Sequence, residues 1–167
     1  MVEPVIPEHL SAVIQKLRDC GCTIEIKGRA VTITPSEITA VDITTQPFPG
    51  FPTDLQAPFM ALMCTAKGTS VISEKIYENR LQHVAELQRM GASIRLEGST
   101  AIVEGVAQLS AAPVTGTDLR AAAAMVLAGL SAKGITEVAG LKHLDRGYDD
   151  LEAKLSAAGA EVKRNIP

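Results

Sequence analysis

The segment at 46–56 (QPFPGFPTDLQ) is the one best suited to hold a carboxylate in a fixed place. Its three prolines and one glycine favour a stiff, extended loop that ends where a helix begins. Thr53 and Gln56 have the spacing of a capping box, in which each side chain satisfies a backbone N–H. Asp54 then has two interpretations: an acid that stabilises the helix N-terminus, or a carboxylate that orients or deprotonates a substrate hydroxyl. The rigidity of the loop favours the second interpretation.

Arginines recur near the beginnings of other predicted helices. The segment at 117–120 (TDLR) repeats the Thr-Asp pair, which predicts Thr117 as a helix N-cap, but has Arg120 where the first copy has Gln56. An arginine in a first helical turn opposes the helix dipole unless it binds an anion, although a surface pair with Asp118 or another carboxylate would explain it equally well.

Arg80 and Arg146 follow Asn79 and Asp145, which we expect to cap two further helices. If these helix ends converge with that of Arg120, the guanidinium groups form a cationic site. Such a site suits a phosphate or a carboxylated phosphate, because guanidinium groups bind these oxygens in pairs.

The elements that must position these residues form a repeat of roughly 70 residues. The stretches 9–28, 83–98 and 148–164 each combine an amphipathic helix, a glycine that ends it and a short strand. Helices that alternate with strands indicate an α/β or α+β class. Strands are expected in the runs rich in β-branched residues, at 23–26, 31–34, 41–44, 70–73, 93–96, 101–103, 136–138 and 161–163.

Composition argues against several other functions. The 167 residues have a net charge of −3, no Trp and 3% aromatic residues, so we expect no nucleic-acid partner. No apolar run is long enough to span a membrane and no signal peptide is recognisable, so we expect a cytoplasmic protein without a membrane partner. Neither the three histidines nor the three cysteines have metal-ligand spacing; we expect packed or surface imidazoles and core thiols.

Four segments together resemble the enolpyruvyl transferase family, and within it the UDP-N-acetylglucosamine 1-carboxyvinyltransferases. They are PGFPTDLQ at 49–56, ENR followed by HVAELQRMGA at 78–92, TDLRA at 117–121 and HLDRGYDDLEAKL at 143–155. The resemblance covers residues 5–165. The related 5-enolpyruvylshikimate-3-phosphate synthases share the architecture but not the FPTDLQ and ENR segments.

The resemblance implies an inside-out α/β barrel built from βαβαββ units, with the helices inside and the active site between two such domains. Residues 1–167 would be one partial domain with about two and a half of three units, at about 1–40, 41–110 and 111–167. We expect the second domain of such an enzyme to lie outside these residues. The remainder of the enzyme is thus an expected partner, and an uncovered strand edge or apolar helix face would favour a homodimer.

The implied reaction transfers the enolpyruvyl group of phosphoenolpyruvate to the 3′-hydroxyl of UDP-N-acetylglucosamine, the first committed step of peptidoglycan synthesis. That step serves cell wall biogenesis, cell shape and cell division. No metal or organic cofactor is implied. The family also uses a Lys-Asn pair and a glycine-rich loop with Cys and Arg, and neither has a match here. We therefore expect the chain to carry about half of the active site and to be inactive alone.

The matched positions imply roles on the sugar side of the site. Asp54 positions and deprotonates the sugar hydroxyl, Ile76 contacts the UDP-sugar through its backbone, and Arg80 lines the same cleft.

On the phosphoenolpyruvate side, Asp118 corresponds to a proton-relay acid, while Arg120 and Arg146 correspond to anion-binding arginines. The implied catalytic residues are thus Asp54, Asp118 and Arg146. Two alternatives stay open: a non-catalytic module that binds a UDP-sugar or a protein, and an enolpyruvyl transferase that acts on a related acceptor such as shikimate 3-phosphate. A decayed module would have no need to retain all of these charged residues.

Overall fold

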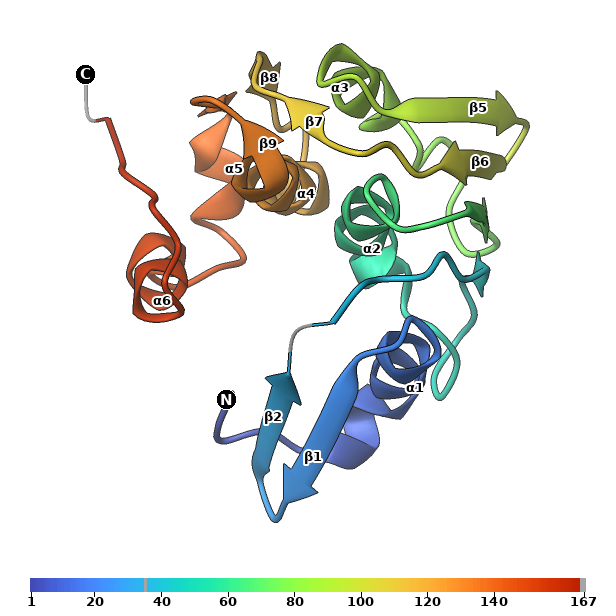
Figure 1. Cartoon of the computed structure of the whole chain (residues 1–167), viewed down its shortest axis with the longest axis vertical. Helices are drawn as coiled ribbons and strands as arrows, with labels where there is room; N and C mark the ends of the chain where they lie inside the picture. The colour runs from blue at the N-terminus through green and yellow to red at the C-terminus, as the bar shows by residue number, and fades with distance from the viewer. Residues whose placement is uncertain (35, 166–167) are drawn as a thin grey trace.

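A computed structural model describes residues 1–34 and 36–165 of the chain, and Figure 1 shows the order of its elements. The helices are η1 (Pro7–Leu10), α1 (Ser11–Asp19), η2 (Thr53–Leu55), α2 (Gln56–Met63), α3 (Val84–Arg89), α4 (Leu119–Ser131), α5 (Leu141–Leu144) and α6 (Leu151–Ala157), with η1 and η2 of the 3₁₀ type. The strands are β1 (Thr23–Lys27), β2 (Ala30–Thr34), β3 (Ile43–Thr44), β4 (Thr69–Ser73), β5 (Ser93–Glu97), β6 (Thr100–Glu104), β7 (Leu109–Ser110), β8 (Pro113–Thr115), β9 (Ala132–Lys133) and β10 (Glu137–Ala139).

The largest sheet has the order β3-β4-β6-β5. β3 and β4 run parallel, whereas β4 pairs with β6 and β6 with β5 in antiparallel fashion. The same two kinds of pairing recur elsewhere in the chain. β8 and β10 form a second parallel pair, and β1 and β2 form a hairpin like that of β5 and β6. The mixture of parallel and antiparallel pairs confirms the expected α/β class.

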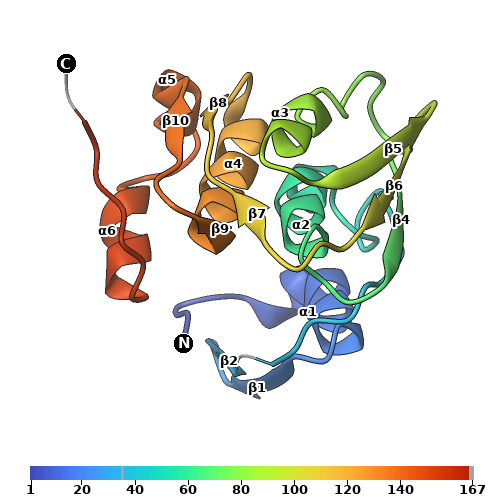
Figure 2. The same cartoon turned by 45° about the horizontal axis from the view of Figure 1, so that its top comes forward.

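Helices α2 and α4 lie side by side in the interior, and the strands lie around them (Figure 2). A helix that is apolar on all sides is stable only when it is buried on all sides. Helix α2 has the sequence QAPFMALM, and α4 has an alanine-rich run whose small side chains permit close approach. The main core includes Met60, Met63, Met125 and Ala128 from these two helices. The interior helices and outer strands agree with the expected inside-out arrangement, and the described residues form no closed barrel.

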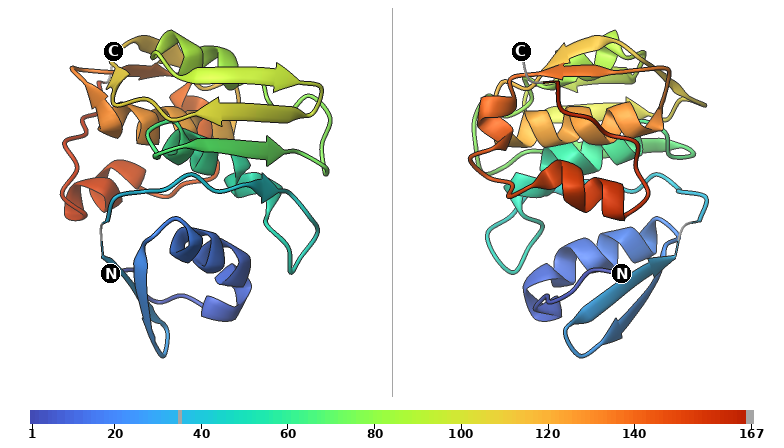
Figure 3. Two further views of the ribbon diagram at one scale, coloured as in Figure 1. Left: turned by 45° about the vertical axis from the view of Figure 1, so that its right-hand side comes forward. Right: turned by 90° about the vertical axis from the view of Figure 1, so that its left-hand side faces the viewer.

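Helix α1 and the β1–β2 hairpin form a small body at one end of the molecule (Figure 3). It has a core of its own, made of Ile14, Cys22, Ile24 and Val31. Cys20, at the end of α1, belongs instead to the main core and links the two clusters. None of the described helices combines the length and the apolar character that a membrane crossing requires.

The strand expected at 161–163 is wrong: the chain runs through these residues without regular pairing. β-branched composition alone does not make a strand, because a strand exists only where another strand supplies its hydrogen bonds. The short helix α5 and the short strands β7, β8 and β9 were not expected from the sequence.

A close backbone contact leads to the first prediction. Gly105 follows β6, and a Cβ atom there would lie 1.6 Å from the carbonyl oxygen of Ala66. We expect Gly105→Ala to lower the free energy of unfolding by about 1–3 kcal/mol or more, because the backbone has to move apart. Urea titration of the 167-residue chain measures this change.

Gly98→Asn is the matched control. Gly98 lies in the β5–β6 turn with a φ of +60° and has open space around the Cβ position. Because asparagine tolerates this left-handed conformation, the substitution should cost less than about 1 kcal/mol. Equal stability of Gly105→Ala and the parent would contradict the close contact.

Candidate functional site

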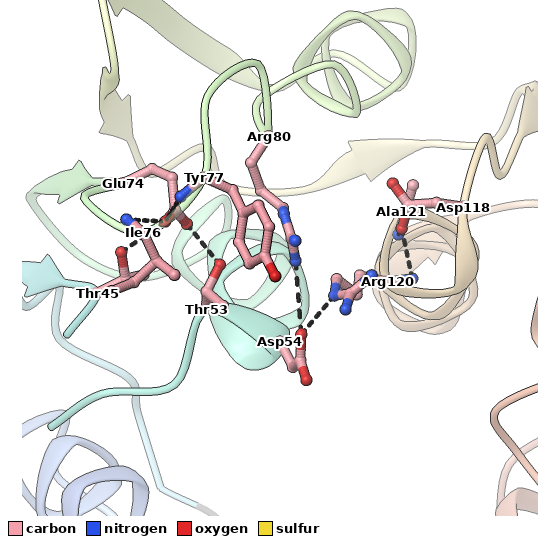
Figure 4. A network of polar contacts seen from close by, with 10 residues as sticks. All are labelled: Thr45, Thr53, Asp54, Glu74, Ile76, Tyr77, Arg80, Asp118, Arg120 and Ala121. Atoms are coloured by element: carbon pink, nitrogen blue, oxygen red, sulfur yellow. Dashed lines mark hydrogen bonds and ion pairs between the residues drawn. The ribbon is translucent and has the colours of Figure 1, made fainter. Parts of the chain in front are cut away.

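The carboxylate of Asp54 lies between two guanidinium groups from distant parts of the chain (Figure 4). Its Oδ1 atom accepts a hydrogen bond from Nε of Arg120 at 2.6 Å and lies 3.5 Å from Nη1 of Arg80. The side chain of Asp54 is 63% exposed, whereas those of Arg80 and Arg120 are 12% and 23% exposed. Because both contacts are made by Oδ1, the Oδ2 atom is left for another donor.

Arg80 lies on the loop between β4 and α3 and is held by an aromatic ring. Its guanidinium carbon is 4.1 Å from the ring centroid of Tyr77, a cation–π arrangement. Because little of the side chain is exposed, the guanidinium has few alternative conformations. The group is therefore in place beside Asp54 before any ligand binds.

Arg120 is fixed by the beginning of helix α4. Oδ1 of Asp118 accepts the backbone N–H groups of Arg120 at 2.7 Å and Ala121 at 3.1 Å, so Asp118 is the N-cap. The sequence pattern favoured Thr117 as the cap and was wrong by one residue. Capping of the helix thus occupies the Oδ1 atom of Asp118. A role of Asp118 in proton relay stays a prediction.

The two arginines and one aspartate leave one positive charge uncompensated. The sequence allowed a surface ion pair between Arg120 and Asp118 or another carboxylate. In the structure, Arg120 pairs with the exposed carboxylate of Asp54. The sequence-based candidates for anion binding and for proton abstraction are thus in contact. Such a site attracts an anion.

The capping box expected for Thr53 and Gln56 is wrong. Thr53 Oγ1 donates to Oε2 of Glu74 at 2.9 Å, and the buried amide of Gln56 has no partner among the described residues. Pro52 is the N-cap of η2, so Thr53 already lies inside the turn, and the ionised carboxylate of Glu74 is the stronger acceptor.

Two other expected caps are also wrong. Helix α3 begins at Val84, four residues after Arg80, and Asn79 lies in a loop with a φ of +55°. Helix α6 begins at Leu151, so Asp145 and Arg146 precede it by several residues. Arg80 and Arg146 are therefore loop residues rather than members of a first helical turn.

Arg146 does not join Arg80 and Arg120 in this structure: it is exposed and forms no ion pair with any residue in the described ranges. Its neighbour Asp145 is instead paired with Arg164 at 2.7 Å, and this hydrogen bond lowers the pKa of Asp145.

The segment that carries Arg146 nevertheless lies against the site. A Cβ atom at Gly147 would be 3.2 Å from Cδ1 of Leu119, the first residue of α4. Burial raises the pKa of Tyr148, the charge of Asp54 raises it further and that of Arg120 opposes the rise. Tyr148 is therefore close to the Asp54–Arg120 pair, which the sequence did not reveal.

Glu74 is a second residue that sequence reasoning missed. It follows β4 and is 2% exposed, and its carboxylate accepts hydrogen bonds from Thr45, Thr53, Ile76 and Tyr77. Burial alone would raise the pKa of Glu74, but these four hydrogen bonds outweigh it and lower the pKa. No local pattern marks it, because an acidic residue directly after the strand TSVIS is ordinarily exposed.

Ile76 is 38% exposed beside this site. Its backbone N–H donates to Oε1 of Glu74 at 2.8 Å. A backbone contact with a sugar nucleotide, as the resemblance implies, would therefore use the carbonyl oxygen of Ile76.

The other candidate ligands and nucleophiles are structural. Burial raises the pKa of Cys20 to about 11 and that of Cys64 to about 12, so these thiols are protonated near neutral pH. His83 is buried, and the described residues contain no group of three side chains that could hold a metal ion. This part of the chain thus has an arginine–carboxylate site rather than a thiolate site.

Comparison with known proteins agrees with the family resemblance found in the sequence. The family description EPSP synthase (3-phosphoshikimate 1-carboxyvinyltransferase) matches residues 1–155. Two curated relatives are both named UDP-N-acetylglucosamine 1-carboxyvinyltransferase. The chain is 98% identical to that of Synechococcus sp. (strain CC9605) over 167 residues and 82% identical to that of Parasynechococcus marenigrum (strain WH8102) over 163 residues. It covers 39% and 38% of their lengths.

Two solved structures share the fold. The enolpyruvyl transferase NikO from Streptomyces tendae matches 92% of this chain with a TM-score of 0.83 and 28% identity, over 36% of its own length. EPSP synthase from Acinetobacter baumannii matches 93% of this chain, over 37% of its own length, with a TM-score of 0.69. At 23% identity the second likeness concerns the fold alone.

The buried imidazole of His83 leads to a prediction on pH dependence. Burial lowers the pKa of His83 to about 4, and an interaction with the Arg80 backbone only partly opposes this. The unfolded chain therefore binds a proton between about pH 6.5 and pH 4 that the folded chain excludes. This contribution to stability is fully present above pH 6.5 and is lost as the pH falls towards 4.

We expect the free energy of unfolding to fall by about 3 kcal/mol from this one group between pH 7 and pH 4. In His83→Gln that part of the pH dependence should be missing. Urea titrations of both proteins at several pH values measure it. The same pH dependence in parent and variant would contradict the buried neutral state of His83.

Proposed function

The chain belongs to the EPSP synthase family of enolpyruvyl transferases, and on that premise we propose that it forms part of the active site of a UDP-N-acetylglucosamine 1-carboxyvinyltransferase. The proposed reaction joins the enolpyruvyl group of phosphoenolpyruvate to the 3′-hydroxyl of UDP-N-acetylglucosamine and releases phosphate. The observation that carries the proposal is the carboxylate of Asp54, held between Arg80 and Arg120 with one oxygen left for a further donor.

Asp54 would act on the sugar. Its Oδ2 atom accepts the 3′-hydroxyl, takes the proton as the oxygen attacks C2 of phosphoenolpyruvate, and so serves as the general base. C3 of phosphoenolpyruvate gains a proton in the same step from a general acid that the remainder of the enzyme would supply. The resulting tetrahedral intermediate loses phosphate from C2 and a proton from C3, which restores the double bond.

The arginines would bind phosphoenolpyruvate. Its phosphate and carboxylate are anions, and the uncompensated positive charge beside Asp54 favours them over a neutral ligand. Arg80 is held by Tyr77 and Arg120 by the beginning of α4, so the charges need little rearrangement as negative charge develops. Arg146, on the loop that packs against Leu119, would turn in as a third anion-binding group.

The choice of UDP-N-acetylglucosamine over shikimate 3-phosphate rests on the names of the relatives that are 98% and 82% identical. A non-catalytic module is the weaker alternative, because Asp54, Arg80 and Arg120 keep a geometry that such a module does not need. The proposal assigns the chain to peptidoglycan synthesis in the cytoplasm and thereby to cell wall biogenesis, cell shape and cell division.

The remainder of a longer enzyme would supply the other groups of the site, since the chain spans 39% of the length of its Synechococcus relative. We propose that residues 1–167 act as one domain of that enzyme. We define the hybrid enzyme as the Synechococcus relative with this chain in place of the matched segment. It places the residues described above in a full-length background.

Phosphate release tests the proposal. The hybrid enzyme should release phosphate from UDP-N-acetylglucosamine and phosphoenolpyruvate, and the 167-residue chain alone should not. Turnover by the isolated chain would contradict its incompleteness. Activity of the hybrid on shikimate 3-phosphate but not on the UDP-sugar would favour the related reaction, and micromolar binding of the UDP-sugar to the isolated chain in calorimetry would favour the non-catalytic module.

Substitution of the proposed base gives a sharper result. In the hybrid enzyme, Asp54→Asn should lower kcat by about 10²–10⁴-fold, because the amide does not accept the hydroxyl proton. Asp42→Asn is the matched control: Asp42 is another aspartate whose Oδ1 atom accepts a hydrogen bond, here from the N–H of Val71 at the sheet. The control should keep the parental kcat. Equal kcat in Asp54→Asn and the parent would contradict the role of Asp54.

A further inference from the structure

Glu74 is the most completely hydrogen-bonded carboxylate near the proposed site (Figure 4). Its Oε1 atom accepts from Thr45 Oγ1 at 2.8 Å, from the N–H of Ile76 at 2.8 Å and from that of Tyr77 at 3.1 Å. Its Oε2 atom accepts from Thr53 Oγ1 at 2.9 Å. The residue is 2% exposed, and no described cationic side chain forms an ion pair with it.

These bonds connect the two segments that carry the proposed substrate contacts with the end of β3. Thr53 directly precedes Asp54 in η2, and Ile76 and Tyr77 belong to the loop that leads to Arg80. Thr45, at the end of β3, accepts the N–H of Lys75 at 2.8 Å and so holds the same loop from its other side. One buried carboxylate thus determines where the loop lies relative to Asp54.

The carboxylate has a property that a neutral side chain lacks. A glutamine could keep three of the bonds on one oxygen, but its N–H₂ group cannot accept from the hydroxyl of Thr53 and could only donate to it, which reverses the fourth bond. Only the bond to Thr53 therefore requires the second oxygen of Glu74. Burial of a carboxylate without a cationic partner costs free energy of folding. This cost argues that the bond between Glu74 and Thr53 has a role beyond packing.

We propose that Glu74 is a positioning residue, which acts through Thr53 to hold Asp54 in register with the backbone of Ile76. This inference rests on the proposed function, because the register matters only if Asp54 and Ile76 contact the same sugar nucleotide. The backbone of Arg120 does not depend on Glu74, since Asp118 accepts its N–H at the cap of α4. Loss of the bond to Thr53 should therefore affect the sugar substrate more than phosphoenolpyruvate.

The test compares substitutions at both ends of the bond in the hybrid enzyme. Thr53→Val removes the hydroxyl at nearly constant volume, Glu74→Gln removes the second acceptor, and Thr53→Ser keeps the hydroxyl. We expect Thr53→Val to lower kcat by about tenfold to a hundredfold, since it leaves Oε2 of Glu74 without its partner. Glu74→Gln should lower kcat less, because its amide N–H₂ can donate to Thr53 Oγ1 in place of the lost bond. KM for UDP-N-acetylglucosamine should rise, KM for phosphoenolpyruvate should change little, and Thr53→Ser should keep the parental values.

Glu86→Gln is the control, because Glu86 also accepts a backbone N–H, that of Thr115 at 2.9 Å, but lies on α3 outside this network. It should keep the parental kcat and both KM values. Parental kinetics in Thr53→Val would overturn the positioning role, and so would equal losses in Thr53→Ser and Thr53→Val. An inactive parent hybrid enzyme would instead overturn the proposed function, and the positioning role with it.

Discussion

The close packing of α2 against α4 is the constraint on which the site depends. Small side chains, among them Ala57 and Ala61 on one helix and Ala124 and Ala128 on the other, are buried in the main core and let the two helices approach. The beginnings of both helices then lie at the same end, where Asp54 meets Arg120 across 66 residues of sequence. An exposed ion pair contributes at most about 1 kcal/mol, so helix packing brings these charges together and not the reverse. A pair that adds so little stability is better explained by ligand binding.

The Thr-Asp pairs at 53–54 and 117–118 have the same sequence, but their carboxylates contact different partners. In the second copy the carboxylate of Asp118 turns inward and caps α4, whereas in the first copy Asp54 turns outward to two arginines. Glu74 explains the difference in physical terms, because it takes the hydroxyl of Thr53 and fixes the first turn without help from Asp54. The same Thr-Asp pair thus gives one aspartate that caps its own helix and one that pairs with two arginines.

Local sequence patterns predicted the elements whose stability is local. The hairpins β1–β2 and β5–β6 and the glycine-terminated helices follow from alternation and punctuation, and Arg120 was found because it breaks a rule of helix electrostatics. Features that depend on distant partners were missed. Glu74 contacts Thr45 and Thr53 at separations of 29 and 21 residues, for which no local pattern exists. The strand expected at 161–163 failed for the same reason, since it has no paired neighbour in the described chain.

In the proposed complex, Asp54 faces the acceptor hydroxyl of a sugar nucleotide while the arginines face an anion. Both contacts can be seen in a crystal structure of the hybrid enzyme with UDP-N-acetylglucosamine and phosphoenolpyruvate bound, in which Asp54→Asn prevents turnover. We predict that the sugar 3′-hydroxyl lies within hydrogen-bond distance of residue 54 and that Arg120 contacts the phosphoenolpyruvate. A sugar bound away from residue 54, with Arg120 still directed at that residue and not at the anion, would contradict the account.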